Sequence, residues 1–183
     1  MTNPDPGGAF VQAVDVATEH RIVVSAMPAF VYRAILELDL RESLVIRRLF
    51  QLRGIPARAA TFEGLQKLGF NLLATRENCS VVLGVAGRFW TRSGNLQHLT
   101  PEGFRSFTCH GFAKATWSFT IRASAGGCSE LRTCTKIQCF GRRARSVFKA
   151  YWFVVGPFSG WTRREALRII KARAEDRSSR DAA

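Results

Sequence analysis

The stretch "FAKATWSFTIRA", residues 112–123, shows the clearest alternation of apolar and polar side chains in this chain. Successive side chains of a β-strand point to opposite faces, so this stretch predicts a strand with one apolar face and one polar face. We expect the polar face to lie in water. The apolar face would carry Ala113, Ala115, Trp117, Phe119 and Ile121.

A second alternating segment, "SELRTCTKIQCF" (residues 129–140), follows the turn-forming letters "SAGG". Upstream, "FNLLATREN" (residues 70–78) and "SVVLGVAGRFW" (residues 80–90) flank a polar turn. Strands joined by short turns pair antiparallel, so these hairpins predict an antiparallel sheet. The apolar faces would carry Leu131, Thr133, Thr135, Ile137 and Cys139 in one segment and Val81, Leu83, Val85 and Phe89 in the other.

Helical structure is expected between the first strand and these hairpins. "HRIVVSA", residues 20–26, predicts the first strand, and Pro28 suits the first turn of a helix, where no N–H is needed. A second short helix would begin at Ser43 as its N-cap and end at Gly54. One further turn of helix is expected within residues 61–69.

After the last strand, apolar positions recur every three or four residues, which predicts one long helix over residues 142–175. Within it, "KAYWFVVGPFSGWTRR" (residues 149–164) has no charge between Lys149 and Arg163. A helix needs about 20 apolar residues to cross a bilayer, so this run is too short to span one. It needs cover on several sides, which a sheet curving around the helix would provide. We expect Pro157 to bend the helix.

The order of strand, two short helices, antiparallel strands and one long C-terminal helix predicts an α+β fold. With "AMPAFVYRAILELDL", "VVLGVAGRFW", "GFAKATWSFTIRA" and "YWFVVGPFSGWTRREALRIIKARAE", it resembles the START-like, or SRPBCC, superfamily, and especially its bacterial polyketide cyclase/dehydrase-like members. The resemblance implies a helix-grip fold over residues 19–176, in which a curved antiparallel sheet wraps the C-terminal helix and encloses a cavity. Residues 1–18 and 177–183 would be flexible tails.

The resemblance implies a pocket rather than a reaction, because the matched motifs are architectural. Members of the superfamily bind lipids, sterols, polyketides and plant hormones, and a minority are cyclases, hydrolases or oxygenase subunits. This sequence departs from its relatives at Thr108, Cys109 and His110, which stand where similar sequences have two acids and a proline. We expect binding of a small hydrophobic ligand, such as a lipid, fatty acid or polyketide-like molecule. A cyclase or hydrolase acting in the same cavity is the alternative.

The inward faces of sheet and helix would give the cavity apolar walls with a few hydroxyl groups. This composition suits an apolar ligand with one or two polar groups, which Tyr151, Thr133 and Thr135 would orient. The other interpretation is a filled core, because large aromatic side chains close cavities as readily as they line them. The predicted ligand-binding residues are Val85, Phe89, Trp117, Phe119, Leu131, Thr133, Thr135, Phe148, Tyr151, Trp152 and Val155.

The sequence contains no recognisable set of catalytic residues, neither a nucleophile elbow nor a Walker loop. His20, His98 and His110 are expected to be ordinary surface residues. Cys109 beside His110 would point to the opposite face of a strand. The five cysteines form no C-x-x-C pair, which disfavours a zinc site and a disulfide framework. We expect no metal and no cofactor, and the catalytic residues stay unknown.

The formal net charge is +13, and most of the excess lies in residues 142–180. A basic helix face attracts anionic lipid or nucleic acid, although it is more often solvated surface, and we do not expect a nucleic-acid partner. The N-terminus lacks a basic region followed by an apolar run, so it predicts no secretory signal and a cytoplasmic location. An anionic membrane surface is the second alternative partner, bound through Arg163, Arg164, Arg168 and Lys171.

Overall fold

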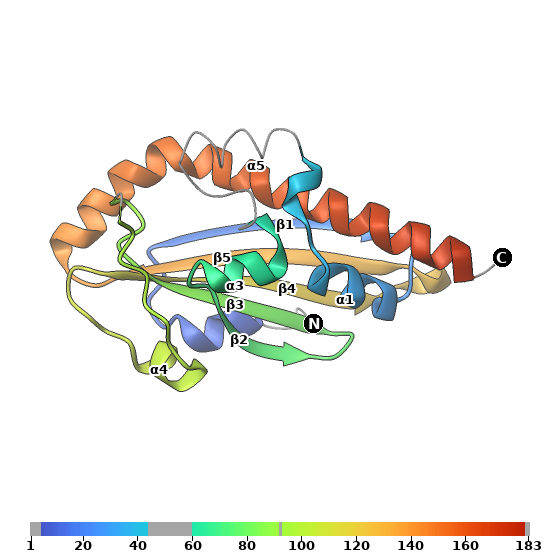
Figure 1. The fold of residues 1–183 in the computed structure, drawn as a ribbon, viewed down its shortest axis with the longest axis horizontal. Helices are drawn as coiled ribbons and strands as arrows, with labels where there is room; N and C mark the ends of the chain where they lie inside the picture. Colours follow the sequence, from blue (N-terminus) through green and yellow to red (C-terminus); the bar gives the residue numbers. More distant parts are fainter. Residues whose placement is uncertain (1–4, 44–59, 92, 182–183) are drawn as a thin grey trace.

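The computed structural model describes residues 5–43, 60–91 and 93–181 of the 183-residue chain. Five strands form one antiparallel sheet in the order β1-β5-β4-β3-β2, and a long C-terminal helix lies across one face (Figure 1). This α+β arrangement has the plan of a helix-grip fold, as the sequence predicts. In chain order the elements are η1 (Pro6–Phe10), β1 (Val16–Val24), α1 (Pro28–Leu36), η2 (Leu40–Glu42), α3 (Phe62–Lys67), β2 (Asn71–Arg76), β3 (Ser80–Gly87), α4 (Pro101–Ser106), β4 (Ala113–Ala123), η4 (Ala125–Gly127), β5 (Ser129–Cys139) and α5 (Arg142–Asp181).

The hairpin of β4 and β5 confirms the alternation from which the sheet was predicted. Trp117 pairs with Thr135 and Phe119 pairs with Thr133, so the apolar face of β4 continues into β5. The hairpin of β2 and β3 is also confirmed, and Asn78 in its turn adopts a positive φ of 54°. Asparagine tolerates this left-handed conformation better than most residues do.

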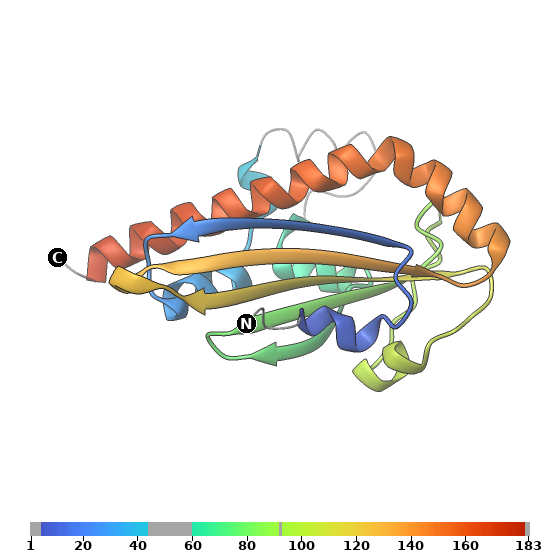
Figure 2. The same cartoon turned by 180° about the vertical axis from the view of Figure 1, so that it is seen from behind.

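Helix α5 begins at Arg142, as expected, and continues to Asp181, beyond the expected end of the domain. Its C-terminal half packs against the sheet and α1 through buried side chains such as Leu167 and Ile170, which belong to the main core. Pro157 lies inside the helix, where proline removes a backbone hydrogen bond and favours a bend. The helix accordingly arches over the sheet (Figures 1 and 2).

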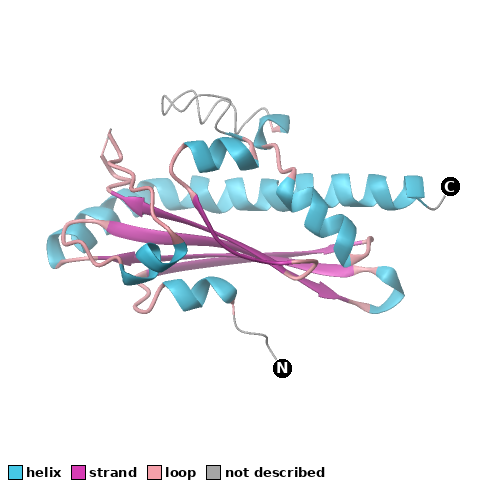
Figure 3. Cartoon of the chain, turned by 60° about the horizontal axis from the view of Figure 1, so that its bottom comes forward, coloured by secondary structure: helices cyan, strands magenta, loops and turns pink. Residues whose placement is uncertain are grey.

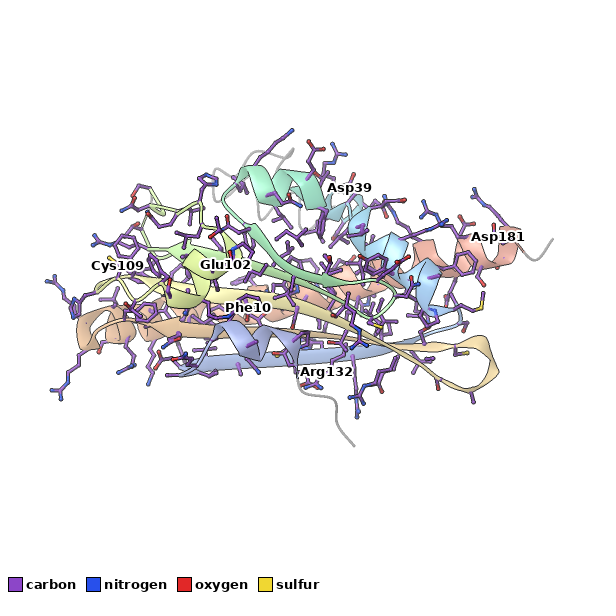
Figure 4. All side chains as sticks on the ribbon, turned by 90° about the horizontal axis from the view of Figure 1, so that it is seen from below. Phe10, Asp39, Glu102, Cys109, Arg132 and Asp181 are labelled. Carbon is purple, nitrogen blue, oxygen red and sulfur yellow. The ribbon has the colours of Figure 1, made fainter. Side chains whose placement is uncertain are left out.

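Most of the β4 part of the opposite face is not in water, although Thr120 and Arg122 near the end of β4 keep partial exposure. Lys114, Thr116 and Ser118, which the alternation placed on a wet face, are each 2% exposed or less. The elements η1 and α4 cover this face (Figures 3 and 4), and Phe10 and Phe104 meet there edge to face at 6.3 Å. The prediction of a wet face was wrong for these three residues, because the segments that cover them are distant in sequence and leave no mark on the local alternation.

Asp5 joins the N-terminal segment to the sheet. Its carboxylate caps the first turn of η1, accepts a hydrogen bond from Ser118 Oγ and pairs with Lys136 Nζ at 2.9 Å. Burial raises the pKa of this carboxyl, but the hydrogen bonds from Ser118 and Lys136 outweigh burial and hold the pKa below its usual value. Part of the tail expected over residues 1–18 therefore packs on the domain, and β1 begins at Val16.

Two of the helices expected between β1 and β2 are present. Helix α1 begins at Pro28, and α3 is capped by Thr61, whose hydroxyl accepts the Gly64 N–H at 2.9 Å. The helix expected to begin at Ser43 lies outside the described residues. Within the described part of the chain, no helix is long and apolar enough to cross a membrane.

Candidate functional site

The N-terminal half of α5 does not pack against the sheet as its C-terminal half does. No side chain in residues 149–159 is buried, although all of this stretch after Lys149 falls within the longest uncharged run of the helix. A helix lying flat on a sheet buries a side chain at every third or fourth position, as residues 166–174 do. Residues 149–159, which we call the arch, therefore leave inward-facing apolar side chains without full cover.

The predicted ligand-binding residues fall into separate groups rather than one wall. Those in the main core, with α1 and the C-terminal half of α5, are Trp117, Phe119 and Leu131. Those in a second cluster at the N-terminal end of α5 are Phe89, Phe148, Tyr151 and Trp152. Val85, Thr133 and Thr135 are buried on the same face of the sheet, and Val155 is half-exposed in the arch.

Aromatic rings join the N-terminal end of α5 to the sheet. The Phe148 ring stacks on Trp152 with centroids 5.6 Å apart, and it meets Trp90 edge to face at 5.9 Å. Tyr151 adds a tilted contact with Phe148 at 5.9 Å. Trp90 lies in the loop after β3, so no strand or helix period indicated that it would contact α5. Its apolar character was the only sequence signal for such a contact.

The structure brings a charged residue, Arg163, between α5 and the sheet. Its Nε donates a hydrogen bond to Thr135 Oγ1, and its Nη1 donates to the carbonyl and hydroxyl oxygens of Ser159 at 3.1 and 2.6 Å. The guanidinium lies over the Trp117 ring, 5.2 Å from its centroid. Arg163 thus links α5 to β4 and β5 just after the arch, apart from the exposed Arg164 and Arg168 with which the sequence grouped it.

No acidic side chain balances the charge of Arg163. Its guanidinium forms no ion pair with any Asp or Glu among the described residues, and residues 44–59 contain no acidic residue in their sequence. Burial lowers the pKa of the guanidinium to about 10, because the charged form loses hydration. The side chain still carries its charge at neutral pH, so the fold holds an uncompensated cation.

Two polar atoms of the edge strand β1 lie in the same region and have no hydrogen-bond partner among the described residues. They are Thr18 Oγ1 and His20 Nε2, both closed off from solvent. In the β1–β5 ladder, Thr18 pairs with Thr135 and His20 pairs with Thr133. Burial, and then the positive charges of nearby arginines, lower the pKa of His20, so its imidazole is neutral at pH 7.

The hydroxyl groups of the two threonines expected to orient a ligand are already engaged. Thr133 Oγ1 accepts a hydrogen bond from Trp117 Nε1 at 2.8 Å and donates to a backbone carbonyl of β4 at 3.0 Å. Thr135 Oγ1 accepts the hydrogen bond from Arg163. Besides the unpartnered atoms of Thr18 and His20, the guanidinium rather than these hydroxyls is therefore the group in this region with donors to spare.

The sequence did hold a signal for Arg163. It follows Ser159 by four residues and precedes Ala166 by three, which places it on the inward stripe of the helix. The surrounding basic residues masked this signal. Of these, Arg168 pairs with a glutamate at 3.3 Å and Lys171 donates to a backbone carbonyl of β1 at 2.8 Å.

The other histidines and the buried cysteines offer no activated nucleophile. His98, Cys109 and His110 are exposed. Cys134 and Cys139 are buried in β5, and burial raises the pKa of their thiols to about 11 and about 12. Both thiols are therefore protonated at neutral pH and are poor nucleophiles.

A groove of about 810 Å³ lies on the opposite side of the sheet, between the N-terminal segment and strands β1 and β5. Charged side chains of both signs line it, among them Asp5, Glu19, Arg132 and Lys136. These pair with one another, Asp5 with Lys136 and Glu19 with Arg132. Its charges are compensated, so this groove offers less to a ligand than the region under α5 does.

Comparison with known proteins assigns no family. No family model matches the chain, and no curated protein matches it significantly. The solved structure of TTHA0849 from Thermus thermophilus is 10% identical, covers 89% of this chain and 99% of its own, and has a TM-score of 0.35. The Zhui aromatase/cyclase of Streptomyces sp. R1128 is 12% identical, covers 88% of this chain and 94% of its own, and has a TM-score of 0.33. Likeness at this level carries no argument about activity.

Proposed function

We propose that this protein binds a small hydrophobic molecule, of the lipid, fatty acid or polyketide-like class, between the arch of α5 and the sheet. The arch carries the proposal, because this largely apolar stretch, whose one charged residue is Lys149, buries none of its side chains. Burial of apolar surface is worth about 25 cal/mol per Å². A stretch of this composition without full cover gains free energy from a partner, and an apolar ligand would supply the cover.

The order of side chains along α5 indicates how such a ligand would lie. Trp152 and Val155 are three residues apart, share one helix face and are half-buried, whereas Phe153 on another face is 86% exposed. The second cluster, which contains Phe89, Phe148, Tyr151 and Trp152 and which we call the Phe148 cluster, lies toward the start of the helix. Arg163 lies beyond the other end of the arch. This order suits a ligand with an apolar body and one polar end. The START-like resemblance of the sequence points the same way.

Binding of a neutral fluorescent probe, N-phenyl-1-naphthylamine, tests the proposal. Its fluorescence should rise in the presence of the protein, and native mass spectrometry should detect a co-purified hydrophobic molecule. The variant Val155→Arg places a charge on the inward face and should weaken probe binding about tenfold or more.

The matched control is Val154→Arg, because Val154 is the adjacent residue and is 63% exposed. This control should bind the probe within about twofold of wild type. An unchanged probe affinity in Val155→Arg, or an empty protein with no fluorescence response, would reject the proposed site.

A second candidate function is association of α5 with an anionic membrane surface. The outward side of the arch exposes Phe153, Val154 and Phe158, and the basic residue Lys149 lies beside them. No acidic residue occurs in residues 142–164. Apolar side chains next to basic ones are typical of helices that lie in the interface of anionic membranes.

Sedimentation with vesicles tests this candidate. Wild type should sediment with phosphatidylglycerol vesicles at low salt and stay in the supernatant with phosphatidylcholine vesicles. Replacing Phe153 and Phe158 together by alanine should abolish sedimentation and leave binding of the neutral probe unchanged. Recovery of wild type in the supernatant with both vesicles would exclude this candidate.

A further inference from the structure

We propose that the molecule bound beneath the arch carries a carboxylate group and that the guanidinium of Arg163 binds it. This inference rests on the proposed function, and it names the chemistry of the polar end of the ligand.

The first support is the unbalanced charge. A buried cation without an anion is costly, and proteins usually provide a carboxylate for it. Among the described residues, the acceptors of Arg163 are all neutral: Thr135 Oγ1 and the two oxygens of Ser159. The acidic residue in helix α5 that lies nearest to it in sequence, Glu165, is engaged with Arg168. An anionic ligand would therefore supply the charge that the described part of the chain does not.

The second support is the unused bonding capacity of the guanidinium. A guanidinium has five N–H donors, and here Nε and Nη1 account for the bonds to Thr135 and Ser159. The two N–H groups of Nη2 make no hydrogen bond with the described residues. Arginine binds carboxylates through such a planar pair of donors. Nη2 is not among the unpartnered side-chain atoms that are closed off from solvent, so a ligand can approach this end of the otherwise buried guanidinium.

The third support is the surroundings, which favour a single negative charge. His20 is the other ionisable side chain facing this region from β1, and it is neutral at pH 7 because burial and the arginines lower its pKa. Its unpartnered Nε2 and the unpartnered Thr18 Oγ1 offer neutral hydrogen bonds. Arg164, whose charge also lowers the pKa of His20, is exposed, so Arg163 is the cation on the inner side of α5. A single inward cation with neutral partners matches a carboxylate.

The position of Arg163 fixes the orientation of the ligand. Its guanidinium lies over Trp117, on the side of the main core, while the Phe148 cluster lies at the opposite end of the arch. The carboxylate would lie at the Arg163 end, and the apolar body would extend along Val155 and Trp152 toward that cluster. A fatty acid or an aromatic acid has this layout.

A matched pair of probes tests the inference. Decanoate and decan-1-ol share one chain and differ in the terminal group, and their affinities are measured by displacement of N-phenyl-1-naphthylamine at about pH 8, where the acid is ionised. Transfer out of water favours the alcohol, because it carries no charge to desolvate. A protein that binds decanoate about tenfold more tightly than decan-1-ol must therefore provide a cation.

Arg163→Gln should remove this preference by weakening decanoate alone, and Arg163→Lys should restore part of it. Arg164→Gln is the matched control, because Arg164 is the adjacent residue and is exposed, and it should retain the preference. Equal binding of the two probes by wild type, or a preference that survives Arg163→Gln, overturns the inference and leaves the proposed function intact. Failure of wild type to bind either decanoate or decan-1-ol, or the fluorescent probe, overturns both.

Discussion

Replacing Arg163 by methionine should make the ligand-free protein more stable. Within the described part of the chain, the buried charge of Arg163 has neutral partners only, and such an arrangement costs stability. Methionine has a similar length, carries no charge and adapts its shape to irregular sites. The side chain would still cover the Trp117 ring, so the packing contribution of the arginine stem would be retained.

The magnitude follows from the pKa and from the lost hydrogen bonds. Burial lowers the pKa of Arg163 to about 10, and one pH unit corresponds to about 1.4 kcal/mol, so burying the charge costs on the order of 3 kcal/mol. Thr135 Oγ1 would lose its donor, at a cost of about 1–3 kcal/mol. The net gain is roughly 1 kcal/mol, and it should grow when Thr135→Val removes the stranded hydroxyl. The pKa is lowered in the folded state, so the penalty is fully present at pH 7 and declines as the pH rises above about 10.

Urea unfolding measures this gain as a change in the free energy of unfolding. The protein must first be freed of bound molecules, because a ligand held by Arg163 would stabilise wild type and hide the effect. Arg164→Met is the control, and it should stay within about 0.5 kcal/mol of wild type because the residue is exposed. A loss of about 1 kcal/mol or more in Arg163→Met would refute the reasoning and identify Arg163 as a structural link between α5 and β5.

Three further predictions concern the framework, and urea unfolding checks each of them. Asp5→Asn should lower the free energy of unfolding by about 1–2 kcal/mol at pH 7. The difference should begin to shrink below about pH 4 and disappear only as the pH falls through the lowered pKa of the folded state, because the carboxyl stabilises the fold only while ionised. Equal stability at pH 7 would count against this role. Gly84→Ala should lower the free energy of unfolding by about 1–3 kcal/mol, because an added Cβ would come 2.4 Å from Leu73 Cδ1. An unchanged free energy of unfolding would contradict this packing. Phe148→Ala should lower the free energy of unfolding by about 3–5 kcal/mol because Phe148 is buried, whereas Phe153→Ala should lower it by less than about 0.5 kcal/mol because Phe153 is exposed. Similar losses in both variants would mean that this part of α5 is packed differently.

The elements of the fold could be predicted from the sequence because their signals are local. The alternation in residues 112–123 and 129–140 follows from the two-residue period of a strand, and the three- and four-residue spacing after residue 142 follows from the period of a helix. Part of the candidate site followed in the same way: Trp117 and Thr135 do face α5. These periods belong to a single backbone, so no partner segment is needed to detect them.

Only the tertiary structure decided which side chains are covered, and by what. Ser118 meets Asp5 across 113 positions of sequence, so no window of residues shows that the polar face of β4 is buried. In the sequence, Arg163 is one of many basic residues of a helix. Only the packing of α5 across the sheet brings it to Thr135, which lies 28 positions earlier. Burial and charge balance depend on pairs of distant segments, and for that reason the sequence predicted the strands and the helix, whereas their packing determined the chemistry of the site.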